Sequence, residues 1–278
     1  MLPTFRNMEQ WANATAAPSE TSMQDLILET KGLTKEFMGF TAVNNVNLQV
    51  QRGTIHALIG PNGAGKTTCF NLLTKFLKPT SGEIRFNGID ITNEPPAQIA
   101  RRGVIRSFQI SAIFPQLSVL ENVRIGLQRA TGMSFQFWRS DSVLRRLDDR
   151  ARELLELVDL ADMAHHETGS LPYGRKRALE IATTLAMEPE LMLLDEPTQG
   201  MGHEDVDRVT DLIQRVSEGR TILMVEHNMK VVARITNHIT VLSRGAVLAE
   251  GNYAEVSAHP AVMEAYMGTT AGELEGAH

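Results

Sequence analysis

The chain has 278 residues, of which 42% are hydrophobic and 22% are charged, the composition of an ordinary globular protein. Its 27 basic and 33 acidic side chains give a formal net charge of −6, so no overall attraction to nucleic acid is expected. The single cysteine, Cys69, excludes an internal disulfide, and no stretch approaches the ~18 consecutive apolar residues of a membrane-spanning helix.

The first third of the chain is predicted to be rich in β-structure. Residues 1–24 lack sustained periodicity and are interpreted as a mobile extension. A strand is expected to begin at Leu26, and the alternation of apolar and polar residues over 42–50 predicts a half-exposed antiparallel strand. The apolar run 56–59 is typical of a buried strand, and a further strand over 83–86 is expected to end at an Asn-Gly turn.

Residues of about 110–188 are predicted to form a helical subdomain inserted into this β-rich frame. Apolar residues recur there at helical spacing: Leu144, Leu147, Ala151, Leu154, Leu155 and Val158. A second helical stripe runs from Ala178 to Leu185. The aromatic segment 132–141 is interpreted as a loop or short helix, which either forms a satellite core or contacts a partner.

The last third alternates strands with helices. Strands are predicted at 191–194, 221–225, 239–242 and 246–250, with helices around 206–216 and from Asn228 onward. Such alternation predicts a parallel sheet with right-handed crossovers. The fold class is therefore α/β, and no internal repeat is visible.

A glycine-rich loop follows the strand predicted over 56–59 and precedes a helix that is expected from Thr67. The loop has the pattern G-x-x-x-x-G-K-[ST] and comprises Gly60, Pro61, Asn62, Gly63, Ala64, Gly65, Lys66, Thr67 and Thr68. Glycines let backbone amides converge on phosphate oxygens, and the helix N-terminus adds its positive dipole end. Lys66 is expected to reach the β- and γ-phosphates, and the Thr67 hydroxyl to hold Mg²⁺. The loop therefore predicts a nucleoside-triphosphate site.

An acid pair, Asp195 and Glu196, ends the apolar strand predicted over 191–194. Open α/β sheets bind ligands at this carboxyl end of their strands. Asp195 is predicted to hold Mg²⁺, directly or through water, and Glu196 to orient and deprotonate the water that attacks the γ-phosphate.

With this pair in place, the chain resembles the ATP-binding cassette (ABC) ATPases over residues 25–268. Arg106-Ser107-Phe108-Gln109 resembles the Q-loop of that family, which implies that Gln109 bridges the metal and water site to the helical subdomain. Val225-Glu226-His227 resembles the switch segment, which implies that His227 contacts the γ-phosphate. Phe37 matches the aromatic residue on which the family stacks adenine, although a core role for Phe37 is the alternative.

The segment Leu171-Pro172-Tyr173-Gly174-Arg175 occupies the place of the family signature, LSGGQ. The resemblance implies that this signature faces ATP held by an opposite subunit, so dimerisation completes the sites. Pro172, Tyr173 and Arg175 depart from the usual Ser, Gly and Gln, and Gly202 stands where the family usually has Asp. These departures leave open how strongly the site completed by this signature hydrolyses ATP.

Within the family, the chain most resembles the ATPases that power import of branched-chain amino acids or related amides and urea. The marks are the L-x-Y-G signature with its basic segment and Leu-Glu-Ile-Ala, the segment 117–123, the long stretch 124–150 and the C-terminal 260–268. Lipid or lipopolysaccharide export is the alternative within transport. Non-transport ABC proteins carry paired cassettes or coiled-coil insertions, and GTPases carry an Asn-Lys-x-Asp motif that does not occur here.

The resemblance implies an assembly of several chains at a membrane. It predicts a P-loop ABC cassette with a mixed parallel core sheet, an antiparallel β subdomain and an inserted helical subdomain, followed by a tail at 269–278. The expected ligands are ATP and Mg²⁺, and the expected partners are a second ATPase subunit, identical or distinct, two membrane permeases and an external solute-binding protein. The chain is then expected to lie peripherally on the cytoplasmic face of the inner membrane.

Overall fold

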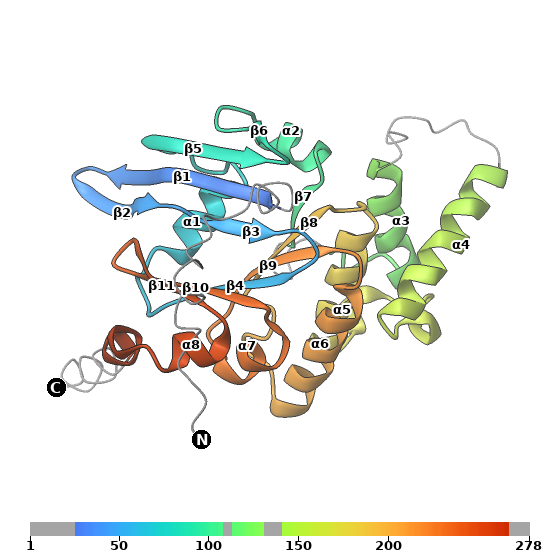
Figure 1. Ribbon diagram of the computed structural model, residues 1–278. Helices are drawn as coiled ribbons and strands as arrows, with labels where there is room; N and C mark the ends of the chain where they lie inside the picture. The colour runs from blue at the N-terminus through green and yellow to red at the C-terminus, as the bar shows by residue number, and fades with distance from the viewer. Residues whose placement is uncertain (1–25, 108–112, 131–140, 267–278) are drawn as a thin grey trace, which may run out of the picture.

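The computed structural model describes residues 26–107, 113–130 and 141–266, in which two β-sheets and their helices are arranged in layers (Figure 1). The predicted extension 1–24, the tail 269–278 and most of the aromatic segment 132–141 lie outside the described residues. The division of the chain into domains therefore stays a prediction.

The smaller sheet is antiparallel and centres on a long first strand. β1 (Leu26–Phe37) pairs with β2 (Phe40–Val46), β3 (Gln49–Gln51) and β5 (Ser81–Phe86), and β5 pairs with the short β6 (Ile89–Asp90). The predicted Asn-Gly turn joins β5 to β6, and both of its residues adopt positive φ, as a two-residue hairpin turn requires.

The single strand predicted over 42–50 is divided in the structure into β2 and β3. The Thr30 hydroxyl lies at the break, where it donates to the Val46 carbonyl at 2.9 Å and accepts from the Leu48 amide at 2.8 Å. These bonds satisfy backbone groups that would otherwise need a continuous ladder. Asn45 has a φ of +50°, which bends the chain just before the break.

The larger sheet has the strand order β11-β10-β4-β9-β8-β7. Its parallel strands are β4 (Ile55–Ile59), β7 (Val104–Ser107), β8 (Leu191–Asp195), β9 (Thr221–Val225) and β10 (His238–Ser243). The edge strand β11 (Ala246–Gly251) is antiparallel to β10. Every residue of β4 and β9 is buried, which explains why these strands appear in the sequence as continuous apolar runs.

Both faces of this sheet are covered. Leu58, Leu193 and Leu223 face the hydrophobic cluster that contains α1 (Lys66–Leu73), α2 (Pro96–Arg101) and the antiparallel sheet. Alternate residues of the same strands face a second cluster, which contains α6 (His203–Val216), α7 (Met229–Ile235) and the short α8 (Tyr253–Ser257). Because both faces of the sheet are covered, a ligand can reach the sheet only at the ends of its strands.

Helices fill the chain between β7 and β8. Among the described residues there, the α-helices are α3 (Val119–Ala130), α4 (Asp141–Leu157) and α5 (Tyr173–Leu185). Ser118 and Glu121 cap the start of α3, because each side chain bonds the backbone amide of the other, at 3.2 and 2.8 Å. Gly126 lets α3 pack closely on α5, since a Cβ there would lie 2.9 Å from the Thr183 carbonyl. Figure 1 shows these helices projecting to one side of the two sheets.

Candidate functional site

The glycine-rich loop lies between β4 and α1, and two of its glycines have no room for a side chain. Gly60 has a φ of +149°, and a Cβ there would lie 2.1 Å from the Leu242 carbonyl oxygen. Gly65 has a φ of +100°, and its Cβ would lie 2.4 Å from the Ala42 oxygen. The backbone therefore takes a course that only glycine allows, and the first amides of α1 face the loop.

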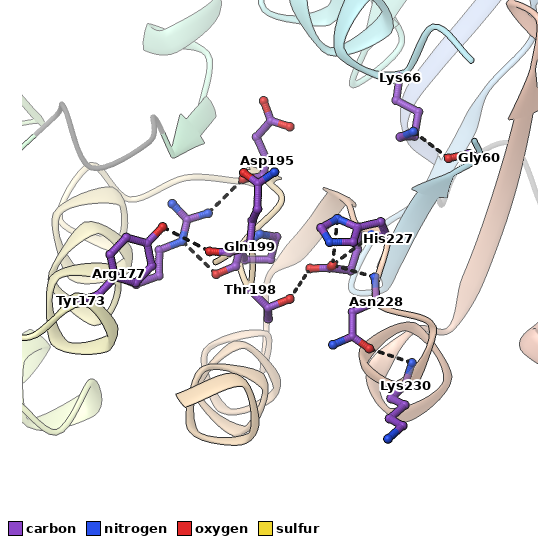
Figure 2. A network of polar contacts seen from close by, with 12 residues as sticks. Gly60, Lys66, Tyr173, Arg177, Asp195, Thr198, Gln199, His227, Asn228 and Lys230 are labelled. Carbon is purple, nitrogen blue, oxygen red and sulfur yellow. Dashed lines mark hydrogen bonds and ion pairs between the residues drawn. The ribbon is translucent and has the colours of Figure 1, made fainter. Parts of the chain in front are cut away.

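Lys66 begins α1 and folds back over the loop. Its ammonium donates to the carbonyl of Gly60 at 2.7 Å and to that of Pro61 at 3.0 Å (Figure 2). Burial lowers the pKa of Lys66, whereas Glu196 and Asp195 oppose that shift, which means that the acid pair lies within electrostatic reach. Within the rest of the loop, Asn62, Gly63 and Thr67 are exposed, Pro61 and Thr68 are half-buried, and Ala64 is buried.

The acid pair lies beside this loop because the strands are in register. Leu58 of β4 is level with Val225 of β9, which is level with Asp195 of β8. The ends of these strands therefore place Gly60, Asp195, Glu196 and the residues after Val225 along one edge of the sheet.

Asp195 is held by an arginine whose role the sequence does not predict. Arg106 of β7 pairs with the Asp195 carboxylate at 2.5 Å and donates to the Asn71 side chain of α1 at 2.6 Å. Both members of the ion pair are largely buried. Arg106 belongs to the same Q-loop-like segment as Gln109, but its partner lies 89 residues away, and no local sequence pattern predicts that pairing.

Glu226 is a second residue without a predicted role, and it organises the loop after β9. Its buried carboxylate accepts the backbone amides of His227 and Asn228 at 2.9 Å each, and the Thr198 hydroxyl at 2.9 Å. The His227 side chain is 55% exposed. A fixed backbone thus presents an imidazole to the edge where Lys66 and Asp195 also lie (Figure 2).

The remaining predicted residues lie apart from that edge or outside the described residues. The signature surrounds the start of α5: Pro172 is the N-cap, the Tyr173 hydroxyl donates to the Gln199 carbonyl at 3.2 Å, and Arg175 bonds the Asp159 carbonyl. Gly174 packs against Asp205, whose carboxyl carbon a Cβ would approach to 2.9 Å.

Figure 2 shows Tyr173 and Lys66 on opposite sides of the Asp195–His227 group. Phe37 ends β1 and is 41% exposed, with the Lys35 ammonium 5.0 Å from the centre of its ring. Gln109 lies outside the described residues.

The chemistry of the donors fits a divalent cation that is held mainly by phosphate. Among the described residues, no three His, Cys, Asp or Glu side chains are grouped to hold a metal by themselves. Thr67 and Asp195 offer one hydroxyl and one carboxylate, and Mg²⁺ is commonly bound by such a small set together with phosphate oxygens and water.

The fold and this site define a P-loop nucleoside-triphosphate-binding protein: a parallel sheet, a glycine loop that leads into a helix, and acids at the next strand ends. Comparisons with known proteins place it further. The ABC transporter family model matches residues 43–199, and one described as "branched-chain amino acid ATP-binding cassette transporter" matches residues 246–272.

Close relatives cover nearly the whole chain. The high-affinity branched-chain amino acid transport ATP-binding protein BraF of Pseudomonas aeruginosa is 40% identical over 252 residues, which cover 87% of this chain and 98% of BraF. The corresponding protein LivG of Escherichia coli K12 is 39% identical over 253 residues, covering 88% and 99%.

The solved structures that resemble this chain are also ATP-binding cassettes of ABC transporters. An ATP-binding cassette of an ABC transporter in its ADP conformation aligns with a TM-score of 0.77 at 29% identity, covering 87% of this chain and 99% of that one. A nucleotide-free ATP-binding cassette aligns with a TM-score of 0.74 at 28% identity, covering 87% and 98%. The chain belongs to the ABC transporter family as an ATP-binding protein and ATPase. None of its described helices has the length and apolar character needed to cross a membrane.

Proposed function

We propose that this chain is the ATPase subunit of an importer for branched-chain amino acids or related amides. The observation that carries the ATPase chemistry is that Lys66, Asp195, Glu196 and His227 lie along one sheet edge. The cargo rests on the relatives, which are named for branched-chain amino acid transport, and on the matching segment 246–272.

In this proposal the loop amides and Lys66 bind the triphosphate, and Phe37 stacks on the adenine ring. Thr67 and Asp195, with Gln109, would hold Mg²⁺, which would neutralise charge on the bound phosphates. Glu196 accepts a proton from the attacking water, and His227 donates a hydrogen bond to the γ-phosphate. Arg106 donates to Oδ2 of Asp195, and a carboxylate can accept such a bond while it also serves a cation.

The signature residues Pro172 to Arg175 act on the nucleotide of a second subunit. Their position is in keeping with this, because Tyr173 lies away from the chain's own Lys66 (Figure 2). The start of α5 offers backbone amides and a positive dipole end to phosphate, and both persist although Pro172 replaces the usual serine.

The membrane permeases dock in a groove between the helices and the sheets. This permease groove has a volume of about 470 Å³ and is lined by side chains from α2, α3, α5 and the segment after α1. Phe76, Phe114 and Ile125 line it and are 55%, 50% and 38% exposed. Large apolar side chains that are grouped on one exposed surface commonly mark a contact site for another protein. The chain then lies on the cytoplasmic face of the inner membrane, and a solute-binding protein delivers the cargo outside.

The replacement Glu196→Gln tests the catalytic part. It is expected to keep ATP affinity within about threefold and to lower kcat at least about a hundredfold, since the general base is lost. ATP binding by fluorescence titration and phosphate release by the purified chain measure both. Glu218→Gln, which neutralises an exposed acid, is the control. Normal turnover by the Glu196→Gln chain would remove Glu196 from the mechanism.

The cargo is tested separately in cells. Replacing Lys66 by alanine is expected to abolish uptake of radiolabelled leucine, isoleucine and valine while uptake of an unrelated amino acid such as histidine continues. If branched-chain uptake is unaffected and export of a lipid fails instead, the cargo assignment is wrong.

A further inference from the structure

A buried ion pair on α5 has no part in binding ATP or in its hydrolysis as proposed. Arg177 and Glu180 are one helical turn apart, with 2.5 Å between the guanidinium and the carboxylate. Their side chains are only 5% and 2% exposed. Arg177 follows the signature by two positions, so the pair lies just inside the helix that would meet the second subunit's nucleotide.

Arg177 uses its whole guanidinium group. Besides Glu180, it donates from Nη2 to the carbonyl of Asp195 at 3.0 Å and from Nε to the carbonyl of Pro197 at 3.2 Å. These two carbonyls belong to the residues on either side of Glu196. Figure 2 shows the guanidinium of Arg177 next to the chain between Asp195 and Thr198.

The backbone between those carbonyls is in an unusual conformation. Glu196 has a φ of +45°, in the left-handed region that non-glycine residues rarely adopt. Its amide donates to the Val225 carbonyl at 2.9 Å, and its carbonyl accepts the Gln199 amide at 3.1 Å. A strained residue persists only when its surroundings hold it, and Arg177 supplies the hold on the side of α5.

Stability alone is a poor explanation for the pair. Burying two charges costs several kcal/mol each, and apolar residues of similar volume are often equally stable. Glu180 is also incompletely satisfied, because its Oε1 has no hydrogen-bond partner among the described residues, and burial raises the pKa of this carboxyl group. The free-energy cost of burying this ion pair is explained if the fixed geometry of Arg177 serves the function of the protein.

The position of the pair indicates that use. Glu180 lines the permease groove, and the same helix begins with the signature. A shift of α5, caused at either end, moves the guanidinium and with it the two carbonyls that flank Glu196. A planar fork with fixed donor directions transmits such a shift better than a flexible ammonium group.

We propose that Arg177 is a positioning residue that sets the backbone geometry of Glu196 and carries movements of α5 to it. The inference rests on the proposed role of Glu196 as the general base. Through Arg177, binding of a second subunit's nucleotide at the signature, or of a permease in the groove, would affect ATP hydrolysis at the chain's own Glu196.

Amide hydrogen exchange tests, independently of ATP hydrolysis, whether Arg177 restrains the backbone around Glu196. The nucleotide-free full-length chain and its Arg177→Lys variant are compared peptide by peptide. We expect amides in residues 195–199 to exchange about tenfold faster in the variant, because lysine cannot hold both carbonyls in one fixed geometry. Peptides from β4 and β10 are expected to exchange as before. Exchange that is unchanged at 195–199, or accelerated throughout the chain, overturns the proposal.

Kinetics test the consequence for Glu196. Arg177→Lys is expected to lower kcat about tenfold while the affinity for ATP stays within about twofold. In a Glu196→Gln background the same change should lower the residual single-turnover rate by less than about twofold, because the group that Arg177 positions is already absent. An equal fall in both backgrounds, or a normal kcat in the single variant, contradicts the proposal.

The matched control is Arg150→Lys, which alters an arginine paired with Glu153 at the same spacing but on the exposed face of α4. Its kcat and exchange pattern are expected to be those of the unaltered chain. If Arg177→Lys does not fold, Glu180→Gln replaces it; kcat should then fall about threefold, and an unchanged kcat refutes the proposal. A Glu196→Gln chain with normal turnover removes Glu196 from the proposed mechanism. An inactive Glu196→Gln chain beside a fully active Arg177→Lys chain refutes only this inference.

Discussion

Lys75 carries its ammonium group into the protein interior, directly after α1. The residue is 7% exposed, and its Nζ has no hydrogen-bond partner among the described residues. Burial lowers its pKa from 10.5 to about 8, against the opposing effect of Asp90 and Glu94. Burial therefore makes the charged form of Lys75 less favourable in the folded state than in the unfolded state.

The sign of the pH dependence follows from that pKa. Between pH 8 and 10.5 the folded state has already lost the Lys75 proton that the unfolded state still binds, so stability rises with pH. We expect Lys75→Met to raise the free energy of unfolding by about 1–3 kcal/mol at pH 7 and to lose this advantage near pH 10. Urea unfolding at both pH values measures it, with exposed Lys78→Met as control. An advantage that persists at pH 10 would argue against a buried charge.

Three neighbouring strands share a chain of polar side chains inside the larger sheet. His56 of β4 bonds the Thr240 hydroxyl of β10 at 2.8 Å, and that hydroxyl donates to Glu250 of β11 at 2.8 Å. The edge strand is thus joined to the strand before the glycine loop by side chains as well as by the ladder. Burial lowers the pKa of His56 to about 3, helped by His238, whose ring centre is 4.9 Å away.

The buried histidine in this series of hydrogen bonds is predicted to make the fold sensitive to mild acid. The His56 pKa of about 3 in the folded state lies below the ordinary 6.5, so the unfolded state binds the proton first as pH falls. Protonation of His56 in the unfolded state should therefore lower the free energy of unfolding by about 2 kcal/mol between pH 6.5 and 5. Denaturant titrations of the His56→Gln variant should show a fall in the free energy of unfolding between pH 6.5 and 5 that is smaller by about 2 kcal/mol. The exposed His259→Gln serves as control, and an equal change in both variants would exclude burial as the cause.

At the scale of the whole molecule, the permease groove joins parts that are distant in sequence. Phe76 follows α1, Phe114 precedes α3 and Ile125 lies on α3, yet all three line one surface. Arg106 and Glu180 also line it, and each of them connects to the acid pair, directly or through Arg177. A partner docked in the groove would therefore lie next to two side chains that connect to the acid pair.

Ile125→Glu is predicted to abolish co-purification of the chain with the permeases and to lower uptake at least about tenfold, because a charge would be buried in an apolar contact. ATP affinity of the variant is expected to stay within about twofold. Met263→Glu, an equally drastic change at an exposed apolar residue outside the lining of the groove, is the control and should transport normally. Normal transport by Ile125→Glu would move the docking surface elsewhere.

Most elements were predictable because their signals are local. Strands buried on both faces, such as β4 and β9, appear as unbroken apolar runs, and α4 and α5 appear as stripes at helical spacing. The strand predicted over 42–50 was wrong in detail, because the break depends on the Thr30 hydroxyl of another strand. The roles of Gln109 and Phe37 stay predictions.

The amino-acid sequence by itself determined the phosphate loop and the positions of the two acids, because the requirements for glycine and for a strand end concern consecutive residues. Only the tertiary structure decided that Arg106 meets Asp195 and that Arg177 meets the carbonyls around Glu196. Side-chain partners depend on how whole sheets and helices pack, and packing sums many weak contacts between residues distant in sequence. No local pattern records that sum, so the links between the site and its surfaces appear only in the fold.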